Sequence, residues 1–235
     1  MDHNVGPICL DELAVYDQTG GRADAAIVFL HGSGDDGPKV RDHFEQMLEE
    51  MQDEISAYTH VKIYFPTAPK NHLTLRDQVT TSWFDGIRNG RKLEDVKVNY
   101  EEANAAAAYV VSIIDEIEAS GIPRNRIFIG GISQGGMLAQ YVAYVKTRGL
   151  AGVCAMASIY PFTQAVILPP PHPKCLILYG AKDPIIPLQG VRLSQLFLKM
   201  GKVRFVLKVL PDSSHDLDEH FVKHMLEHVD KELRR

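Results

Sequence analysis

The run Gly131-Ile132-Ser133-Gln134-Gly135 has the residue types and the spacing of an activated serine. In the pattern G-x-S-x-G, a sharp turn between a strand and a helix leaves no room for side chains on either side of the serine. An apolar run precedes this motif, and helix-forming residues follow it. Backbone N–H groups at the start of that helix favour negative charge that develops nearby. The pattern therefore predicts Ser133 as a nucleophile, against the alternative of a surface serine in a glycine-rich turn.

A serine hydroxyl is a weak nucleophile unless a neighbouring base takes its proton. In proteins with this kind of serine turn, an acid and then a histidine follow later in the chain. Asp183 comes directly after one apolar run, and His215 is the one histidine in a loop after a later run. We expect His215 to accept the proton and pass it to the leaving group, while Asp183 fixes the tautomer of the imidazole.

Other residues compete for these two positions. Asp212 and Asp216 are alternative acids, but they flank His215 too closely to belong to a separate loop. Asp183 could also serve only to begin a turn before Pro184, and His215 could be an exposed neighbour of a helix cap. The chain order favours Asp183 and His215 as partners of the serine.

An ester carbonyl that is attacked by a serine develops negative charge and needs two hydrogen-bond donors. One expected donor is the backbone N–H of Gln134, the residue after the nucleophile. The second is expected from the loop after an early strand, and His31-Gly32-Ser33-Gly34-Asp35 is a glycine-rich loop in that position. We assign the second donor to the N–H of Ser33, with His31 as a support of the loop.

Apolar runs and helical windows alternate along the chain, which predicts an α/β fold with a mainly parallel central sheet and helices on both faces. In such folds the loops at the carboxyl ends of the strands carry the chemistry. The expected strands are Ala25–Leu30, Val61–Phe65, Arg126–Gly130, Leu150–Ala157, Cys175–Gly180 and Val203–Leu210. The expected helices are Val40–Met51, Tyr100–Ala119, Met137–Val145, Leu188–Met200 and Asp216–Leu233.

One long segment, residues 66–98, breaks this alternation. Connections of that length inside a compact domain are uncommon. The segment holds the single tryptophan, Trp83, which favours an ordered flap over a solvated linker. Because no internal repeat or linker is evident, we expect one domain over residues 1–235.

Composition excludes several classes of protein. The 235 residues are 45% hydrophobic and carry a formal net charge of −5, which makes nucleic acid an improbable partner. No run approaches the roughly 20 apolar residues of a membrane span. The three cysteines match no zinc motif and suit a reducing compartment, and Met1–Asn4 does not resemble a signal peptide. We expect a cytoplasmic protein without a transmembrane segment.

A second constellation lies in the last helical window. His224-Met225-Leu226-Glu227-His228 matches the zinc-peptidase pattern H-x-x-E-H, with His220 one turn earlier. Only seven residues follow His228, so a third ligand would have to be Glu232. We expect a solvated or half-buried histidine face and no metal.

With these residues in place, the sequence resembles the acyl-protein thioesterase and lysophospholipase-like group of α/β-hydrolases. The resemblance extends from Ala25 to the last helix. The matching pieces are Phe29–Asp35, Pro66–Pro69, Ser82–Asp85, Gly121–Arg126, Gly130–Gly136, Asp183–Pro187 and His215. The resemblance implies hydrolysis of thioesters and esters, including S-acyl groups on proteins, with no cofactor, and oxyanion donors at Ser33 and Gln134.

The sequence departs from the pattern of this group at two places that bear on the substrate. Long-chain thioesterases of this kind commonly carry leucine at the position of Ser33, and they are rich in methionine where this chain has residues 73–81. The serine looks more like the lysophospholipase-like branch, which is associated with shorter acyl chains. Acyl-covering residues of the flap are expected to be Leu73, Leu75, Val79 and Trp83.

The sequence therefore predicts a serine hydrolase that forms an acyl-enzyme at Ser133. Its expected substrates are acyl esters or thioesters, and S-acylated proteins are candidates. Depalmitoylation of proteins competes with a role as a short-chain carboxylesterase or lysophospholipase. A non-catalytic binding module and a zinc peptidase are more distant alternatives.

Overall fold

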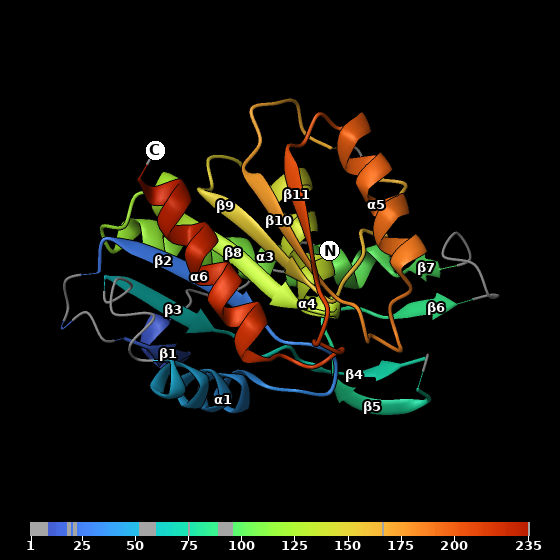
Figure 1. Ribbon diagram of the computed structural model, residues 1–235, viewed down its shortest axis with the longest axis horizontal. Helices are drawn as coiled ribbons and strands as arrows, with labels where there is room; N and C mark the ends of the chain where they lie inside the picture. Colours follow the sequence, from blue (N-terminus) through green and yellow to red (C-terminus); the bar gives the residue numbers. More distant parts are fainter. Residues whose placement is uncertain are drawn as a thin grey trace.

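A seven-stranded sheet is the centre of the computed structural model, which describes residues 9–17, 20, 23–51, 60–74, 76–88, 96–165 and 167–234 (Figure 1). The strand order is β1-β3-β2-β8-β9-β10-β11. All neighbouring pairs are parallel except β1 with β3. The strands are β1 (Ala14–Tyr16), β2 (Ala25–Leu30), β3 (Val61–Phe65), β8 (Ile127–Ile132), β9 (Gly152–Met156), β10 (Lys174–Gly180) and β11 (Phe205–Leu210). The α/β fold with a mostly parallel sheet is confirmed, with β1 as an antiparallel edge strand that the sequence analysis did not predict.

The central strands are apolar throughout because both of their faces are covered. Every residue of β2, β8 and β9 is buried. In β2 the order Ala-Ala-Ile-Val-Phe-Leu therefore shows no alternation between apolar and polar positions. This burial holds the carboxyl ends of neighbouring strands in a fixed register, so that the loops which follow them are placed reproducibly.

Helices cover the two faces of the sheet. One face packs against α1 (Gly37–Glu50) and α6 (Glu219–Leu233), and the other packs against α3 (Tyr100–Ala119), α4 (Gln134–Tyr141) and α5 (Leu188–Met200). In Figure 1, α6 lies in front of the sheet, and α3 and α4 lie behind it. The helices on both faces are confirmed.

Side-chain caps set the beginnings of several helices. Asn99 accepts hydrogen bonds from the N–H groups of Glu101 and Glu102 at the start of α3. Asp218 accepts from the N–H of Phe221, so α6 begins at Glu219 rather than at the predicted Asp216. Short helical turns complete the description: η1 (Leu10–Glu12), η4 (Arg124–Arg126) and a π-helical turn at Val142–Lys146.

The segment predicted as a flap contains short strands that its sequence did not reveal. They form two antiparallel pairs, β4 (Lys70–Leu73) with β5 (Gln78–Thr81), and β6 (Gly86–Arg88) with β7 (Val96–Val98). The β4–β5 hairpin is tied to the loop after β2, because Gly34 N–H donates to Thr81 O at 2.8 Å. No helix in the described part of the chain is long and apolar enough to cross a bilayer.

His228 of α6 is buried against the sheet, and burial lowers its pKa from 6.5 to about 4, with Glu232 and Lys174 as its charged neighbours. As pH falls below 6.5 the unfolded chain binds this proton before the folded chain does, so stability decreases between about pH 6.5 and pH 4. We expect His228→Gln to remove about 3 kcal/mol of the acid-induced loss in the free energy of unfolding, measured by urea unfolding across this range. The same change at exposed His220, also on α6, should leave the pH dependence as it is; equal profiles for wild type and His228→Gln would contradict the prediction.

Candidate active site

The residues singled out as a catalytic set all lie in loops at the carboxyl ends of parallel strands. Ser133 follows β8, Asp183 lies three residues beyond β10, and His215 lies five residues beyond β11. Ser33 lies in the loop after β2, which pairs directly with β8. The parallel register brings these four loops to one edge of the sheet.

Ser133 occupies a turn with an unusual backbone conformation. Its φ is +53° and its ψ is −120°, a backbone conformation that residues other than glycine rarely adopt. The glycines around it are required by close backbone approach. A Cβ on Gly135 would lie 2.1 Å from Leu30 O, and one on Gly131 would lie 2.6 Å from the same oxygen. Strand β2 therefore presses directly on the turn, and the serine side chain is directed out of it.

Ser133, His215 and Asp183 form a continuous hydrogen-bonded chain. His215 Nε2 lies 3.0 Å from Ser133 Oγ, and His215 Nδ1 lies 2.9 Å from Asp183 Oδ2. The Asp183 side chain is fully buried, while the imidazole is 16% exposed. Since a carboxylate only accepts hydrogen bonds, Nδ1 carries the proton and Nε2 is free to accept one from the serine.

Asp183 is held in place by its own loop. Its Oδ1 accepts hydrogen bonds from the N–H groups of Ile185 and Ile186 at 2.8 and 2.9 Å. Neither alternative acid bonds the imidazole in the described structure: Asp212 is exposed and pairs with Lys182 at 2.9 Å, and Asp216 is exposed at the pocket rim. Of the three aspartates considered from sequence, Asp183 is the one whose carboxylate meets the imidazole.

The two predicted oxyanion donors lie beside the serine. A Cβ on Gly32 would lie 3.5 Å from Ser133 Cβ, so the loop that carries Ser33 packs against the nucleophile turn. Within the described residues, neither the Ser33 N–H nor the Gln134 N–H has a hydrogen-bond acceptor. Their role as an oxyanion hole stays a prediction that this geometry allows.

A buried network supports this loop through His31, as predicted, with partners that the sequence analysis did not foresee. Trp83 Nε1 donates to His31 O at 2.9 Å, and the imidazole of His31 accepts from Ala68 N–H at 3.0 Å. Because Nε2 of His31 accepts this bond while Nδ1 donates to Gly32 O, the ring is neutral, and burial lowers its pKa from the usual 6.5. The Gln134 side chain accepts from Trp83 N–H at 2.8 Å and donates to Phe84 O at 2.6 Å. The sequence signals of this arrangement were the one tryptophan in a long segment and the histidine at the start of the glycine-rich loop.

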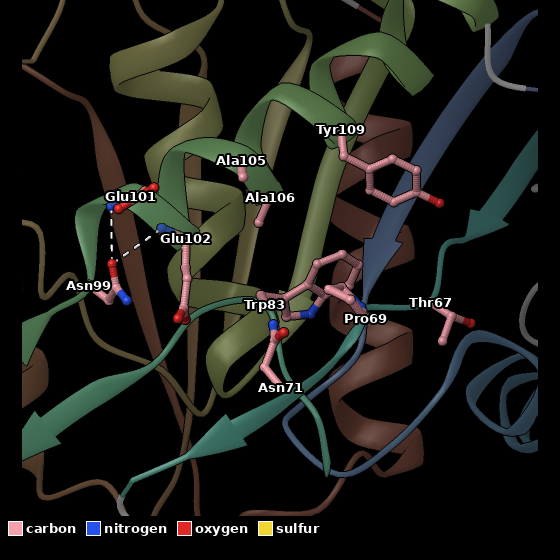
Figure 2. Close-up of a pocket in the computed structure, with 10 residues that line it drawn as sticks. All are labelled: Thr67, Pro69, Asn71, Trp83, Asn99, Glu101, Glu102, Ala105, Ala106 and Tyr109. Atoms are coloured by element: carbon pink, nitrogen blue, oxygen red, sulfur yellow. Dashed lines mark hydrogen bonds between the residues drawn. The ribbon is translucent and has the colours of Figure 1, made fainter. Parts of the chain in front are cut away.

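Of the residues predicted to cover an acyl chain, none of the three that the structure describes lines the catalytic pocket. Leu73 and Trp83 are buried, Val79 is 68% exposed, and Leu75 lies outside the described residues. Trp83 lines a separate cavity of about 770 Å³ between α3 and the β4 region, where Figure 2 shows it facing Tyr109 and Asn71. The acyl-binding role of these residues stays a prediction.

The pocket that holds Ser133 and His215 has a volume of about 490 Å³ and a mixed lining. Its apolar side chains are Val40, Ile132, Ile185 and Leu217. Its charged side chains are Asp35, Lys39, Arg76 and Asp216. Such a pocket suits a small substrate with polar groups better than a long hydrocarbon chain.

The histidines of α6 have separate surroundings. His224 Nδ1 lies 2.8 Å from Glu227 Oε2 on the surface, whereas His228 is buried with its Nδ1 4.0 Å from Glu232 Oε1. In the described part of the chain, no three histidine, cysteine or acidic side chains are grouped so that they could hold a metal ion.

Comparison with known proteins agrees with this architecture. The family model described as Phospholipase/Carboxylesterase matches residues 12–233. The chain is 28% identical to lysophospholipase-like protein 1 of Mus musculus over 85% of this chain and 83% of that protein. It is 31% identical to acyl-protein thioesterase 1 of Schizosaccharomyces pombe over 69% of this chain and 70% of that protein.

A solved structure, SOBER1 of Arabidopsis thaliana, superimposes with a TM-score of 0.75 at 25% identity, covering 89% of this chain and 99% of that one. The matched family region contains all the loops that hold Ser133, Asp183 and His215. From the strand-end loops and the family match together, the chain belongs to the phospholipase/carboxylesterase family and is a hydrolase of esters or thioesters.

Proposed function

We propose that the protein hydrolyses acyl esters and thioesters through an acyl-enzyme on Ser133. The observation that carries the proposal is the hydrogen-bonded chain from Ser133 Oγ through His215 to Asp183. Ser133 Oγ attacks the carbonyl carbon while its proton moves to His215 Nε2. The carbonyl oxygen becomes an anion and accepts hydrogen bonds from the N–H groups of Ser33 and Gln134.

In the remaining steps the same residues act again, with His215 now first giving up its proton. His215 gives its proton to the oxygen or sulfur of the leaving group as the carbon–heteroatom bond breaks. Water then attacks the acyl-serine, His215 takes a proton from that water, and Ser133 recovers its proton as the acid leaves. Asp183 stays ionised and stabilises the imidazolium in both halves. Each step uses only side chains, backbone N–H groups and water.

The pocket favours short acyl groups. Burying hydrocarbon stabilises a complex by about 0.8 kcal/mol per methylene only where the lining is apolar. Here charged side chains, including Arg76 and Lys39, share the lining with four aliphatic residues. The second candidate is depalmitoylation of proteins in the cytoplasm; the name of the acyl-protein thioesterase relatives supports its thioester chemistry on acylated proteins.

A series of esters and thioesters with acyl chains from two to sixteen carbons separates these candidates. If methylenes beyond about the eighth carbon find no apolar contact, kcat/KM should stop rising there and then fall. A long apolar channel would instead raise kcat/KM by about fourfold for each further methylene. The same series on Ser133→Ala gives the uncatalysed and contaminant rate. A continued rise up to palmitoyl would replace the short-chain assignment by the depalmitoylase.

A further inference from the structure

The catalytic pocket contains a guanidinium that the proposed mechanism does not use. Arg76 lies in the turn between β4 and β5 and lines the same pocket as Ser133 and His215. Its Nη1 lies 3.4 Å from the position that a Cβ on Gly34 would take, next to the loop that carries Ser33. The guanidinium therefore lies beside the loop that carries the predicted oxyanion donor Ser33.

The hairpin that carries Arg76 is fastened to that loop. Gly34 N–H donates to Thr81 O at 2.8 Å, and the Thr81 hydroxyl donates to Asp35 O at 2.5 Å. The turn itself is closed by a hydrogen bond from Arg76 N–H to Leu73 O at 3.0 Å. These contacts hold the base of the arginine side chain at a constant distance from the oxyanion loop.

Among the residues that the structure describes, Arg76 is the pocket cation without an acidic partner. Lys39 is paired with Asp36 at 2.7 Å, and the neighbour of Arg76 in the turn, Asp77, faces His72 at 3.2 Å. Across the described residues, no carboxylate forms an ion pair with Arg76. The other carboxylates of the pocket belong to the loops after β2 and β11, where Asp35 Oδ1 accepts Asp36 N–H and Asp216 follows His215.

We propose that Arg76 selects substrates that carry a carboxylate or phosphate close to the reacting ester or thioester. A guanidinium binds such groups through two parallel hydrogen bonds. Although Asp35 and Asp216 share the pocket, neither forms an ion pair with Arg76 in the described structure. The inference rests on the proposed hydrolysis at Ser133, because it concerns the substrate of that site. The anionic group belongs either to the acyl chain or to the leaving group, and the chemistry at Arg76 is the same for both.

Two matched pairs of esters test the proposal on the full-length protein. Para-nitrophenyl hexanoate and the para-nitrophenyl half-ester of adipic acid differ in a carboxylate on the acyl side. The hexanoate esters of para-ethylphenol and of para-hydroxyphenylacetate differ in a carboxylate on the leaving group. We expect one pair to show a higher kcat/KM for the anionic member. Arg76→Ala should lower that anionic-to-neutral ratio by roughly five- to twentyfold, mainly through KM.

Further variants separate selection from a structural role. Arg76→Lys should retain part of the ratio, Arg76→Glu should invert it, and added salt should reduce it. Arg192, an exposed arginine on α5 that does not line the pocket, supplies the control, because Arg192→Ala removes the same charge and should leave the ratio unchanged. An equal ratio in wild type and Arg76→Ala for both pairs would overturn the inference, as would a uniform loss on all four esters. Absence of hydrolysis of every ester by the wild-type protein would instead refute the proposed function itself.

Discussion

Ser133→Ala is expected to lower kcat by about 10⁶-fold, the scale seen when a nucleophilic serine is removed from other hydrolases. The Oγ atom is the only group at the turn that lies within hydrogen-bond distance of His215 Nε2 in the described structure. Without it no acyl-enzyme forms, and labelling by a fluorophosphonate probe should disappear. Steady-state hydrolysis of a short-chain ester and probe labelling are the measurements.

The fold should survive this substitution. The serine side chain contributes one hydrogen bond at the edge of the sheet, so we expect the free energy of unfolding to change by less than about 1.5 kcal/mol. Urea unfolding of the variant therefore provides the control for loss of activity. Hydrolysis that persists at a substantial fraction of the wild-type rate would show that another residue is the nucleophile.

Asp183→Asn is expected to slow turnover by about 10⁴-fold, the loss measured for the same change in other catalytic triads. The asparagine keeps the shape of the side chain and can still accept the N–H groups of Ile185 and Ile186. Its NH₂ group would then point at His215 Nδ1, which favours the tautomer with the proton on Nε2. That tautomer cannot accept the proton of Ser133.

Asp212→Asn is the matched control for this variant. Asp212 lies in the loop that leads to His215, but it is exposed and its carboxylate pairs with Lys182. We expect nearly wild-type kcat for Asp212→Asn, measured with the same ester. A large loss in Asp212→Asn together with a small loss in Asp183→Asn would mean that the wrong acid was assigned.

The strands were the part of the fold that local sequence predicted best. β2 and β3 have the expected bounds, and β8, β9, β10 and β11 differ from expectation by one or two residues at an end. Continuous apolar runs are typical of strands that are buried on both faces, and the turn residues after them mark where they end. β1 was missed because a three-residue edge strand of partly buried residues has neither signal.

The segment predicted as a flap, residues 66–98, is the part of the fold that local sequence predicted least well. Its strands are three or four residues long and form two separate pairs, β4 with β5 and β6 with β7. Strands this short show no periodic pattern in the sequence. Trp83 is buried, its indole N–H donates to His31 O, and its predicted role in covering a substrate stays a prediction. The position of an aromatic side chain depends on residues far away in the sequence: here the indole donates to His31 O, and the backbone N–H of Trp83 donates to the Gln134 side chain.

Residue types and their order by themselves determined the α/β architecture, the nucleophile motif and the candidates for its partners, because strand burial and the glycine turn impose local restrictions on sequence. Chain order favoured Asp183 over Asp212 and Asp216, but only the tertiary structure brings the ends of β10 and β11 side by side and so places the Asp183 carboxylate against His215. It also decided that Arg76 reaches the pocket, because hydrogen bonds between the β4–β5 hairpin and the loop after β2 join segments that are more than forty residues apart. Contacts of that kind leave no periodic trace in a single sequence.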